Sequence, residues 1–202
     1  MNEAMNGAIA KDLHHQGWSL QAHYFDLTLI HQLAAEATQL YQAKQMSRAG
    51  IGRGEFLQQN LSIRQDFTHW LQHDSTGQKQ YQALMETLRL SLNRALYLGL
   101  FEFEAHYAVF EVNAFYTKHL DSFQGNANRI VSVVTYLNVD WPNAGGGELL
   151  IYAADGNELI QSILPNAGTL VVFLSEEMPH EVKTTHHQRM SIAGWFKLKA
   201  VH

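Results

Sequence analysis

Two segments in the first half of the chain carry apolar residues at the spacing of an amphipathic helix. In residues 26–46 the apolar side chains recur on one helical face. Residues 79–99 repeat this pattern more regularly, and Gly99 is the kind of residue at which a helix stops. Both patterns predict helices that pack against a sheet, and neither indicates a cofactor-binding segment.

A glycine-rich stretch lies between the two helical segments. Gly50, Gly52 and Gly54 predict a flexible loop, and residues 62–71 after them have the composition of a short strand. The stretch lacks the lysine and the Ser/Thr that end a phosphate-binding loop. It is therefore interpreted as a mobile lid or an ordinary hairpin loop.

From about Tyr107 the pattern changes to short apolar runs separated by turn residues. β-Branched and aromatic side chains dominate residues 129–138, 148–152, 169–174 and 189–197, with Pro, Asn and Gly between several of them. Strands at this spacing predict an antiparallel sandwich or a barrel-like jelly roll. With no linker or repeat visible, we predict one α+β, mainly β domain over residues 1–202, helices first and a β-core after them.

Composition narrows the classes of function. Of the 202 residues, 46% are hydrophobic and 16% are charged, the net charge is −5, and there is no cysteine. The negative charge argues against nucleic acid as a main partner, and the lack of thiols excludes a thiolate metal site. The start of the chain has no apolar core of signal-peptide length, and no stretch is long enough to span a bilayer. We expect a cytoplasmic protein with no membrane partner.

Three residues are candidate ligands of one metal ion. His119 and Asp121 leave the same face of the chain if that stretch is an extended strand, and His180 follows a later strand. Two imidazoles and one carboxylate, with open coordination positions, suit a non-haem iron(II) oxygenase. Zinc is an alternative, as is a structural role in which His119 and Asp121 form a surface hydrogen-bonded pair.

The strand that begins at Arg189 places further polar groups near these ligands. Arg189, Ser191, Ala193 and Trp195 share one face of that strand by its period of two. A guanidinium is the natural partner of a carboxylate at the far end of a bound ligand, and Tyr136 could donate its hydroxyl to the same group. Alternatively, Arg189 forms a structural ion pair with a residue such as Glu181, and the aromatic residues belong to the core.

Taken in order, these motifs resemble a known family. The segments FYTKHLD, TYLNVDW, GGELLIY, LPNAGTLVVF and PHEV, followed by Arg189 and GWF, resemble the iron(II)- and 2-oxoglutarate-dependent dioxygenases. The greatest similarity is to their prolyl 4-hydroxylase branch, which includes the hypoxia-sensing prolyl hydroxylases and bacterial relatives. The resemblance covers residues 107–197, and it extends faintly upstream to IRQDFTHWL and to GIGRGE as a substrate-covering loop.

The resemblance implies a fold, a cofactor and a reaction. It implies a double-stranded β-helix core over residues 107–197, with residues 1–106 as a helical flank, loop and supporting strands. His119, Asp121 and His180 would hold iron(II), which the keto-acid end of 2-oxoglutarate chelates, and Arg189 with Tyr136 would bind its far carboxylate. With dioxygen, and with ascorbate as a supporting reductant, the products would be succinate, carbon dioxide and a hydroxylated substrate.

The same resemblance implies a substrate class and further pocket residues. The expected substrate is a prolyl residue of a protein or peptide; another side chain, a free amino acid, a small metabolite, or a non-catalytic sensor role are the alternatives. Tyr116, Trp195 and Ser191 match positions near the substrate or cosubstrate, and Arg53 is a candidate for substrate contact on the glycine-rich loop. Two positions depart from the branch: Phe110 stands where a tyrosine is common, and Ala193 where a small polar residue is common.

Other polar residues are assigned no part in the site. Arg64 and Asp66 are expected to support the sheet, and His106 is given no role. His186 and His187 are expected in an exposed hairpin turn rather than on the metal. The sequence predicts no oligomeric state.

Overall fold

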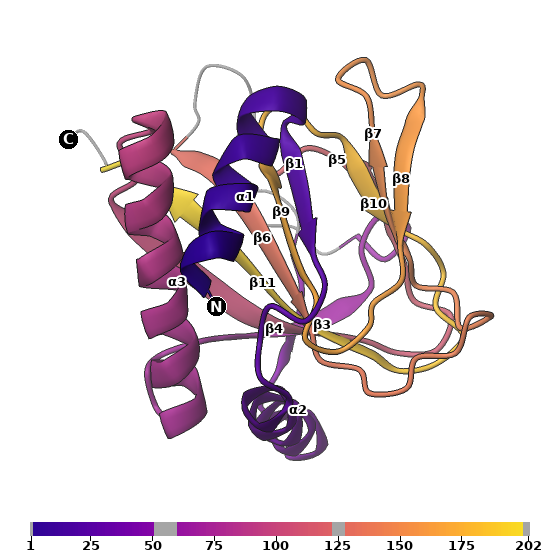
Figure 1. Ribbon diagram of the computed structural model, residues 1–202. Coiled ribbons are helices and arrows are strands. Elements are labelled where there is room, and N and C mark those ends of the chain that lie inside the picture. The colour runs from indigo at the N-terminus through magenta and orange to yellow at the C-terminus, as the bar shows by residue number, and fades with distance from the viewer. Residues whose placement is uncertain (1, 51–59, 123–127, 200–202) are drawn as a thin grey trace.

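The computed structural model describes residues 2–50, 60–122 and 128–199. These residues form three long helices and two antiparallel sheets (Figure 1). The helices are α1 (Asn2–Gln16), α2 (Leu27–Gln42) and α3 (Thr76–Leu96). Of the helices in the described part of the chain, none is both long enough and apolar enough to cross a membrane.

The larger sheet contains seven strands within the described residues and the smaller sheet four, and all neighbouring strands are antiparallel. In order across the larger sheet the strands are β1 (Trp18–Gln21), β9 (Leu170–Leu174), β6 (Arg129–Tyr136), β11 (Arg189–Lys197), β4 (Glu102–Phe110), β3 (Asp66–Trp70) and β2 (Ser47–Arg48). Across the smaller sheet they are β5 (Tyr116–His119), β10 (His180–Val182), β7 (Leu149–Tyr152) and β8 (Leu159–Ile163). Strands far apart in the chain are thus neighbours in both sheets, which confirms the predicted double-stranded β-helix fold.

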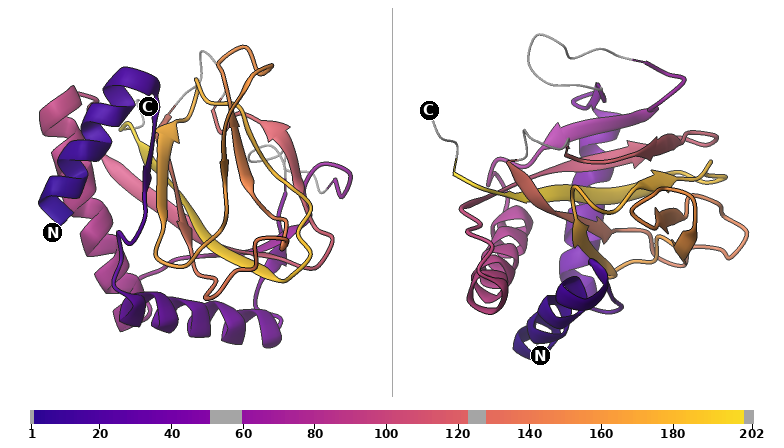
Figure 2. Two further views of the ribbon diagram at one scale, coloured as in Figure 1. Left: turned by 45° about the vertical axis from the view of Figure 1, so that its right-hand side comes forward. Right: turned by 90° about the horizontal axis from the view of Figure 1, so that it is seen from above.

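The molecule is built in three layers. Helices cover one face of the larger sheet, and the smaller sheet lies against the other face (Figure 2). Leu33 and Leu88, from α2 and α3, are fully buried with Val133 of β6 in the core between helices and sheet. Phe173 of β9 and Ile151 of β7 meet in the second core, between the two sheets. The larger sheet is therefore buried on both sides, which explains the apolar runs of its central strands.

Side-chain caps set the start of the two predicted helices. Asp26 accepts a hydrogen bond from the backbone N–H of Thr28 at the start of α2, and Ser75 accepts one from Gln78 at the start of α3. Helix α3 thus begins earlier than the apolar periodicity indicated. Its C-cap is Tyr97, which takes a left-handed conformation two residues before the predicted stop at Gly99.

Several elements differ from the sequence-based expectation. Helix α1 and strands β1, β2 and β8 were not predicted. The strand expected over residues 62–71 is limited to β3, because the residues before Asp66 form a turn and an isolated bridge. The larger sheet receives β4 from Glu102 onward, five residues before the change of pattern at Tyr107. Most of the predicted glycine-rich loop lies outside the described residues.

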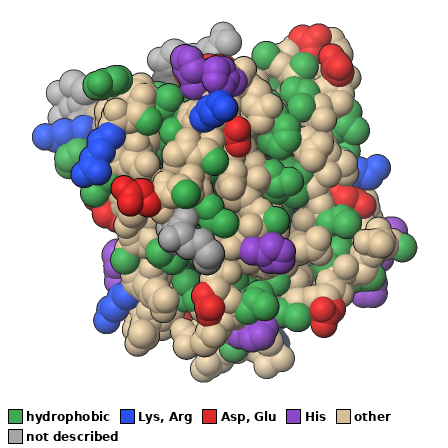
Figure 3. Space-filling view, in the orientation of Figure 1, with side chains coloured by type: hydrophobic (Ala, Val, Ile, Leu, Met, Phe, Trp, Pro, Cys, Tyr) green, Lys and Arg blue, Asp and Glu red, His purple; other side chains and the backbone are tan. Residues whose placement is uncertain are grey.

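Charged side chains are dispersed over the surface seen in Figure 3. Lysine and arginine side chains lie there among acidic ones, and the described residues of this view form no continuous basic area. Histidine side chains gather near the top of the view. The charged groups with unusual environments lie instead in the interior, between the two sheets.

Candidate metal centre and its pocket

Three side chains converge between the two sheets. His119 is the last residue of β5, His180 is the first residue of β10, and the two are register partners in the smaller sheet. Asp121 follows β5 in a bend. One potential ligand atom from each residue lies within 4.8 Å of the others, and Asp121 carboxylate oxygens stand 3.5 Å from His119 Nε2 and 3.7 Å from His180 Nε2.

The local backbone differs from the expectation that His119 and Asp121 share one face of a strand. Strand β5 ends at His119, so Asp121 is not its neighbour by strand periodicity. The bend after β5 returns the carboxylate to the imidazole, and pairing of β5 with β10 brings the second imidazole to the same point. The three residues meet as expected, but a turn and a strand pair bring them together.

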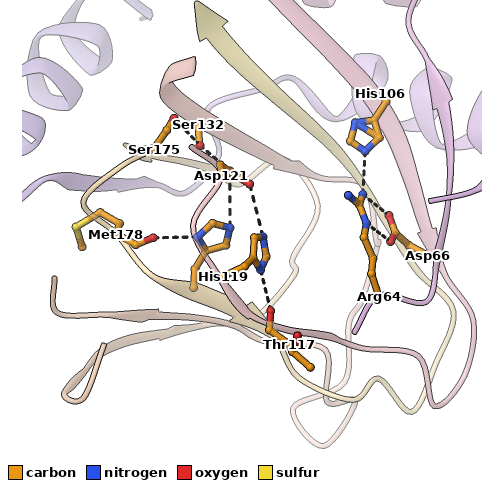
Figure 4. A network of polar contacts seen from close by, with 10 residues as sticks. Arg64, Asp66, His106, Thr117, His119, Asp121, Ser132, Ser175 and Met178 are labelled. Atoms are coloured by element: carbon orange, nitrogen blue, oxygen red, sulfur yellow. Dashed lines mark hydrogen bonds and ion pairs between the residues drawn. The ribbon is translucent and has the colours of Figure 1, made fainter. Parts of the chain in front are cut away.

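Hydrogen bonds orient each of the three side chains (Figure 4). His119 Nδ1 lies 2.8 Å from the Thr117 carbonyl oxygen, and His180 Nδ1 lies 2.9 Å from that of Met178. Each carbonyl can only accept, so each Nδ1 carries the proton and each Nε2 presents a lone pair. Ser132 on β6 donates to the Asp121 carboxylate over 2.6 Å. Outer contacts of this kind fix ligand orientation in metal sites.

The charge states of these groups suit a divalent metal. Burial acts to raise the pKa of Asp121, but its contacts with His180, His119 and Ser132 outweigh burial and hold the pKa well below its usual range. Burial and then the neighbouring His119 lower the pKa of His180 to about 4. Near neutral pH the site thus holds an ionised carboxylate and a neutral His180 imidazole, forms that bind a metal without prior loss of a proton.

Arg189 is a buried cation in the same cavity. Its side chain is only 1% exposed, and it donates to the Gly147 carbonyl over 2.9 Å and to Ser191 Oγ over 3.2 Å. No carboxylate of the described residues forms an ion pair with it, and Glu181 instead accepts a hydrogen bond from Tyr152. The alternative of a structural Arg189–Glu181 ion pair is therefore wrong. A buried guanidinium in this state is a site for an anion from outside the chain.

Tyr136 adds a second polar group beside Arg189. The Arg189 guanidinium carbon lies 5.1 Å from the centre of the Tyr136 ring and 5.1 Å from that of Phe110. The Tyr136 hydroxyl is buried and makes no hydrogen bond of normal geometry with the described residues. A guanidinium and a phenol, both short of partners, fit the far carboxylate of a dicarboxylic cosubstrate.

One cavity of about 60 Å³ joins the candidate metal ligands and Arg189, while Tyr136 lies beside Arg189 and is not among the lining residues. All three candidate ligands line it, together with the residues of β11 that were expected to share one strand face: Arg189, Ser191, Ala193 and Trp195. The donor set and the buried cation therefore open into the same space. Iron(II) at the three ligands and 2-oxoglutarate toward Arg189 fit this arrangement of nitrogen and oxygen donors.

Tyr116 also lies in the cavity wall. Its ring stacks on that of His119, with centroids 3.6 Å apart and an angle of 16° between the planes. Arg64 also lies over the Tyr116 ring, with its guanidinium carbon 4.8 Å from the ring centre. Arg53, the remaining predicted pocket residue, lies outside the described residues.

The structure also brings in residues that sequence reasoning left out. Arg64, Asp66 and His106 all line the cavity, although the first two were expected only to support the sheet and His106 was given no role. Arg64 donates to both carboxylate oxygens of Asp66 and contacts His106. Period two would put Arg64 and Asp66 on one face of the strand predicted over residues 62–71, but no pattern told which face was inside.

The predicted exposed turn is present after β10. His186 and His187 are exposed, and His186 Nδ1 lies 3.0 Å from the Ala144 carbonyl oxygen. Neither residue lies in the cavity wall.

Comparison with known proteins agrees with the fold. Residues 105–197 match the family described as the 2OG-Fe(II) oxygenase superfamily. A prolyl-4-hydroxylase from Pseudomonas putida is 40% identical, with a TM-score of 0.87, over 97% of this chain and 100% of that one. A Trichoplax adhaerens prolyl hydroxylase, solved with a peptide fragment of the hypoxia-inducible factor oxygen degradation domain, is 24% identical with a TM-score of 0.86, over 97% of this chain and 90% of that one.

A shorter match is found to animal proteins. The chain is 32% identical over 82 residues to Egl nine homolog 1 of Rattus norvegicus, which is 40% of this chain and 24% of that protein. It thus spans about a quarter of that relative's length. Residues 105–197, which match the family, contain the two histidines, the aspartate and the buried arginine described above. The similarity to the Pseudomonas putida enzyme extends over 97% of the chain. The chain belongs to the 2OG-Fe(II) oxygenase superfamily.

Proposed function

We propose that the protein is an iron(II)- and 2-oxoglutarate-dependent oxygenase that hydroxylates a prolyl residue of a protein substrate. The observation that carries this proposal is one cavity lined both by His119, Asp121 and His180 and by the buried, unpaired cation Arg189. A metal site alone would fit many functions. A metal site beside a buried anion site fits a metal-chelating cosubstrate with a second, distant carboxylate.

In this proposal the iron and the cosubstrate are held by different parts of the cavity. His119, Asp121 and His180 hold iron(II), and Arg189 with Tyr136 binds the far carboxylate of 2-oxoglutarate. When bound, iron(II) with dioxygen and 2-oxoglutarate supplies the oxidising chemistry, in which the cosubstrate becomes succinate and carbon dioxide and one oxygen atom enters a substrate C–H bond. The protein contributes position and a largely dry cavity.

The chain's own residues do the positioning. The Ser132 hydroxyl holds the Asp121 carboxylate through Oδ2, and the carbonyls of Thr117 and Met178 keep both imidazoles turned toward one point. The rings of Tyr116 and Phe173 pack on the two histidines and cover their sides. These contacts hold the ligand set in place before the metal binds, so little ordering remains to be done on binding.

The prolyl substrate is supported by similarity. The Pseudomonas putida relative, which is 40% identical over its whole length, is a prolyl-4-hydroxylase. The Trichoplax adhaerens protein of the same fold was solved with a peptide, so this fold can seat one. A protein partner and a cytoplasmic location belong to the same proposal. The same oxygenase acting on a free amino acid or a small metabolite is the second candidate, and Ala193, which leaves room where a polar side chain is common, is compatible with either.

Succinate formation tests the proposal directly. The purified protein would be incubated with iron(II), ascorbate, 2-oxoglutarate and dioxygen, with and without a library of proline-containing peptides from abundant cytosolic proteins. Turnover that rises with a peptide, matched by the gain of one oxygen atom on its proline, is the expected result. The Asp121→Ala variant should abolish turnover. Turnover without response to any peptide would contradict the prolyl substrate, and no turnover by protein that binds metal would contradict the oxygenase activity.

A further inference from the structure

His106 lies in the cavity wall with one ring nitrogen occupied and the other free. It is on β4, it is 3% exposed, and its Nε2 lies 3.2 Å from Arg64 Nη2. A guanidinium can only donate, so His106 Nε2 must be the acceptor. In the neutral ring the proton is then on Nδ1, which is a donor.

Arg64 fixes this proton position firmly. Its Nε and Nη2 donate to the two carboxylate oxygens of Asp66 over 2.6 Å and 2.8 Å, so the guanidinium cannot turn away from His106 without losing a bidentate pair (Figure 4). Burial, and then the Arg64 charge, lower the pKa of His106 to about 3. Near neutral pH His106 is therefore a neutral donor through Nδ1–H.

That donor has no acceptor within the described residues. His106 Nδ1 and Trp195 Nε1 are both buried without a hydrogen-bond partner there. The two rings stack, with centroids 5.4 Å apart and an angle of 13°, and both line the cavity. Because a buried unsatisfied N–H is costly, two of them side by side in a cavity wall point to an acceptor that comes with a ligand.

The strand order places His106, though not Trp195, to the side of the residues proposed to bind the cosubstrate. Arg189 and Tyr136 are on β11 and β6, and Ser132, which donates to Asp121, is also on β6. His106 stands on β4, two strands from β6, and thus roughly 10 Å to the side of the Asp121 contact. It is too far to the side to touch the reacting carbon, but it is well placed to contact a neighbouring part of the substrate.

The row of aromatic rings continues from His106 to the surface. On β3, the strand beyond β4, Trp70 is the register partner of His106, and its ring centroid lies 5.1 Å from that of His106. Trp70 is 47% exposed. The row of Trp195, His106 and Trp70 thus crosses three neighbouring strands from the cavity to the surface, as an extended chain entering the site would require.

The charges near the pair favour a neutral acceptor. The Arg64 cation is paired with Asp66, and Arg129, whose guanidinium carbon is 3.6 Å from the Trp195 ring centre, is paired with Glu104. His106 and Trp195 offer N–H groups without charge. A carboxylate placed here would be desolvated without an unpaired cation beside it, whereas an amide carbonyl needs only the hydrogen bonds.

We propose that His106, through Nδ1–H and beside the indole N–H of Trp195, binds a backbone carbonyl of a polypeptide substrate next to the residue that is hydroxylated. This inference rests on the proposed function and makes it narrower, because it selects an amide-linked residue over a free amino acid. His106 is in this view a specificity-determining residue, and Arg64 and Asp66 are positioning residues that set its proton on Nδ1.

The test uses binding by the whole protein loaded with zinc(II), which cannot turn over, and with 2-oxoglutarate. The probes are N-acetyl-L-proline methylamide and free L-proline, titrated while the indole N–H signal of Trp195 is followed by NMR. We expect the amide probe to shift this signal and free proline to leave it in place. His106→Gln, whose side-chain carbonyl can still accept from Arg64, and Trp195→Phe should each weaken binding of the amide probe about three- to tenfold.

His31→Gln, on the exposed face of α2, is the matched control and should bind the amide probe as the wild type does. Equal affinity of the His106→Gln and wild-type proteins for the amide probe would overturn the inference, as would free proline shifting the indole signal in place of the amide. Calorimetric titration of 2-oxoglutarate into the same samples tests the proposed function separately from the inference about His106. Bound cosubstrate with an unmoved indole signal overturns only the inference, while failure of the wild type to bind cosubstrate overturns the proposed function with it.

Discussion

Arg189 is a buried cation whose environment calls for a bound anion from outside the chain. A guanidinium that is 1% exposed and has no carboxylate partner among the described residues carries an unbalanced charge in a low-dielectric interior. Proteins rarely retain such a group unless a bound anion compensates it. The cost of this burial in the free protein is the reason to expect a strong preference for a ligand with a carboxylate at that point.

Replacing Arg189 by methionine should therefore weaken 2-oxoglutarate binding by at least about 30-fold, since loss of a buried charge partner costs about 2 kcal/mol or more. Calorimetric titration of the zinc-loaded protein measures the dissociation constant. Metal affinity should be unchanged, because Arg189 contacts none of the three ligands. Arg94→Met on the exposed face of α3 is the control, and equal affinities of the two variants would contradict the assignment of the anion site.

His106 predicts a particular dependence of stability on pH. Its pKa is lowered from 6.5 to about 3 in the folded protein, mainly by burial and then by Arg64, with Asp66, Trp70 and Trp195 as its other neighbours. Because the histidine pKa is lower in the folded protein, the unfolded chain binds the proton at a higher pH than the folded protein does. The contribution of neutral His106 to the free energy of unfolding is therefore fully present above pH 6.5, and it is lost as the pH falls toward 3.

In the His106→Phe variant this loss should be absent. Relative to its own value at pH 7, the variant should lose roughly 2 kcal/mol less unfolding free energy than the wild type on going to about pH 5. Urea unfolding of both proteins at several pH values measures the difference, in which the contributions of other groups cancel. Parallel stability curves for the two proteins would show that His106 titrates normally.

At the residue level, sequence reasoning recovered the groups whose identity and order are distinctive. The three candidate ligands and Arg189 were found because imidazole, carboxylate and guanidinium recur in a set order. His106 was missed for a physical reason. Strand β4 is buried on both faces, so its histidine sits in an apolar run without the alternation that would show which side chains face the cavity.

At the level of elements, the turn before β7 supports the anion site. Gly146 and Gly147 both have positive φ, of 63° and 68°, and the Gly147 carbonyl accepts the Arg189 Nε–H. A Cβ on Gly146 would stand 2.3 Å from the Thr184 carbonyl oxygen, and the backbone that follows β10 cannot readily move. The turn thus needs glycine both for its conformation and for close approach of two backbones.

Gly146→Ala should therefore lower the free energy of unfolding by more than the roughly 1–2 kcal/mol that a left-handed alanine costs in open space. Gly156→Ala is the matched control, since Gly156 also has positive φ, of 75°, but a Cβ added there would have no heavy atom within 4 Å of it. Urea unfolding of both variants measures the two losses. If Gly156→Ala were as destabilising as Gly146→Ala, the close contact with Thr184 would not be the cause.

The elements themselves were predictable where pattern and packing agree. Helices α2 and α3 have a regular apolar face against the sheet, and the strands β6, β9 and β11 are apolar runs buried on both sides. Helix α1 buries only part of a mixed polar surface, and its sequence has little periodicity to detect. Strand β8 lies at an edge and is largely exposed, so burial imposes little pattern on it.

At the scale of the whole molecule, the spaces between the layers have different roles. The helices cover one face of the larger sheet and form most of the core there, while the space between the sheets holds the cavity. The metal ligands come mainly from the smaller sheet, and the anion site and His106 come from the larger one. A ligand that contacts both sheets therefore ties them together and should stabilise the fold as a whole.

Metal and cosubstrate should stabilise the protein in a linked way. Zinc(II) or manganese(II) alone should raise the melting temperature, and 2-oxoglutarate should add a further rise only when metal is present, because it binds the metal and Arg189 together. At ligand concentrations about 100 times the dissociation constant, each step adds about 2.7 kcal/mol, or roughly 5–10 °C for a chain of this size. Differential scanning fluorimetry measures both steps, and EDTA should reverse them.

Two variants separate the contributions of the two sheets to the rise in melting temperature with metal and 2-oxoglutarate. Asp121→Ala should lose the shift with metal and, with it, the shift with 2-oxoglutarate, because the carboxylate is the one anionic ligand of the set. Arg189→Met should keep the metal shift and lose the further rise with cosubstrate. If 2-oxoglutarate stabilised the Asp121→Ala variant as strongly as the wild type, the cosubstrate would not bridge metal and arginine, and the cavity would not be the shared site that joins the two sheets.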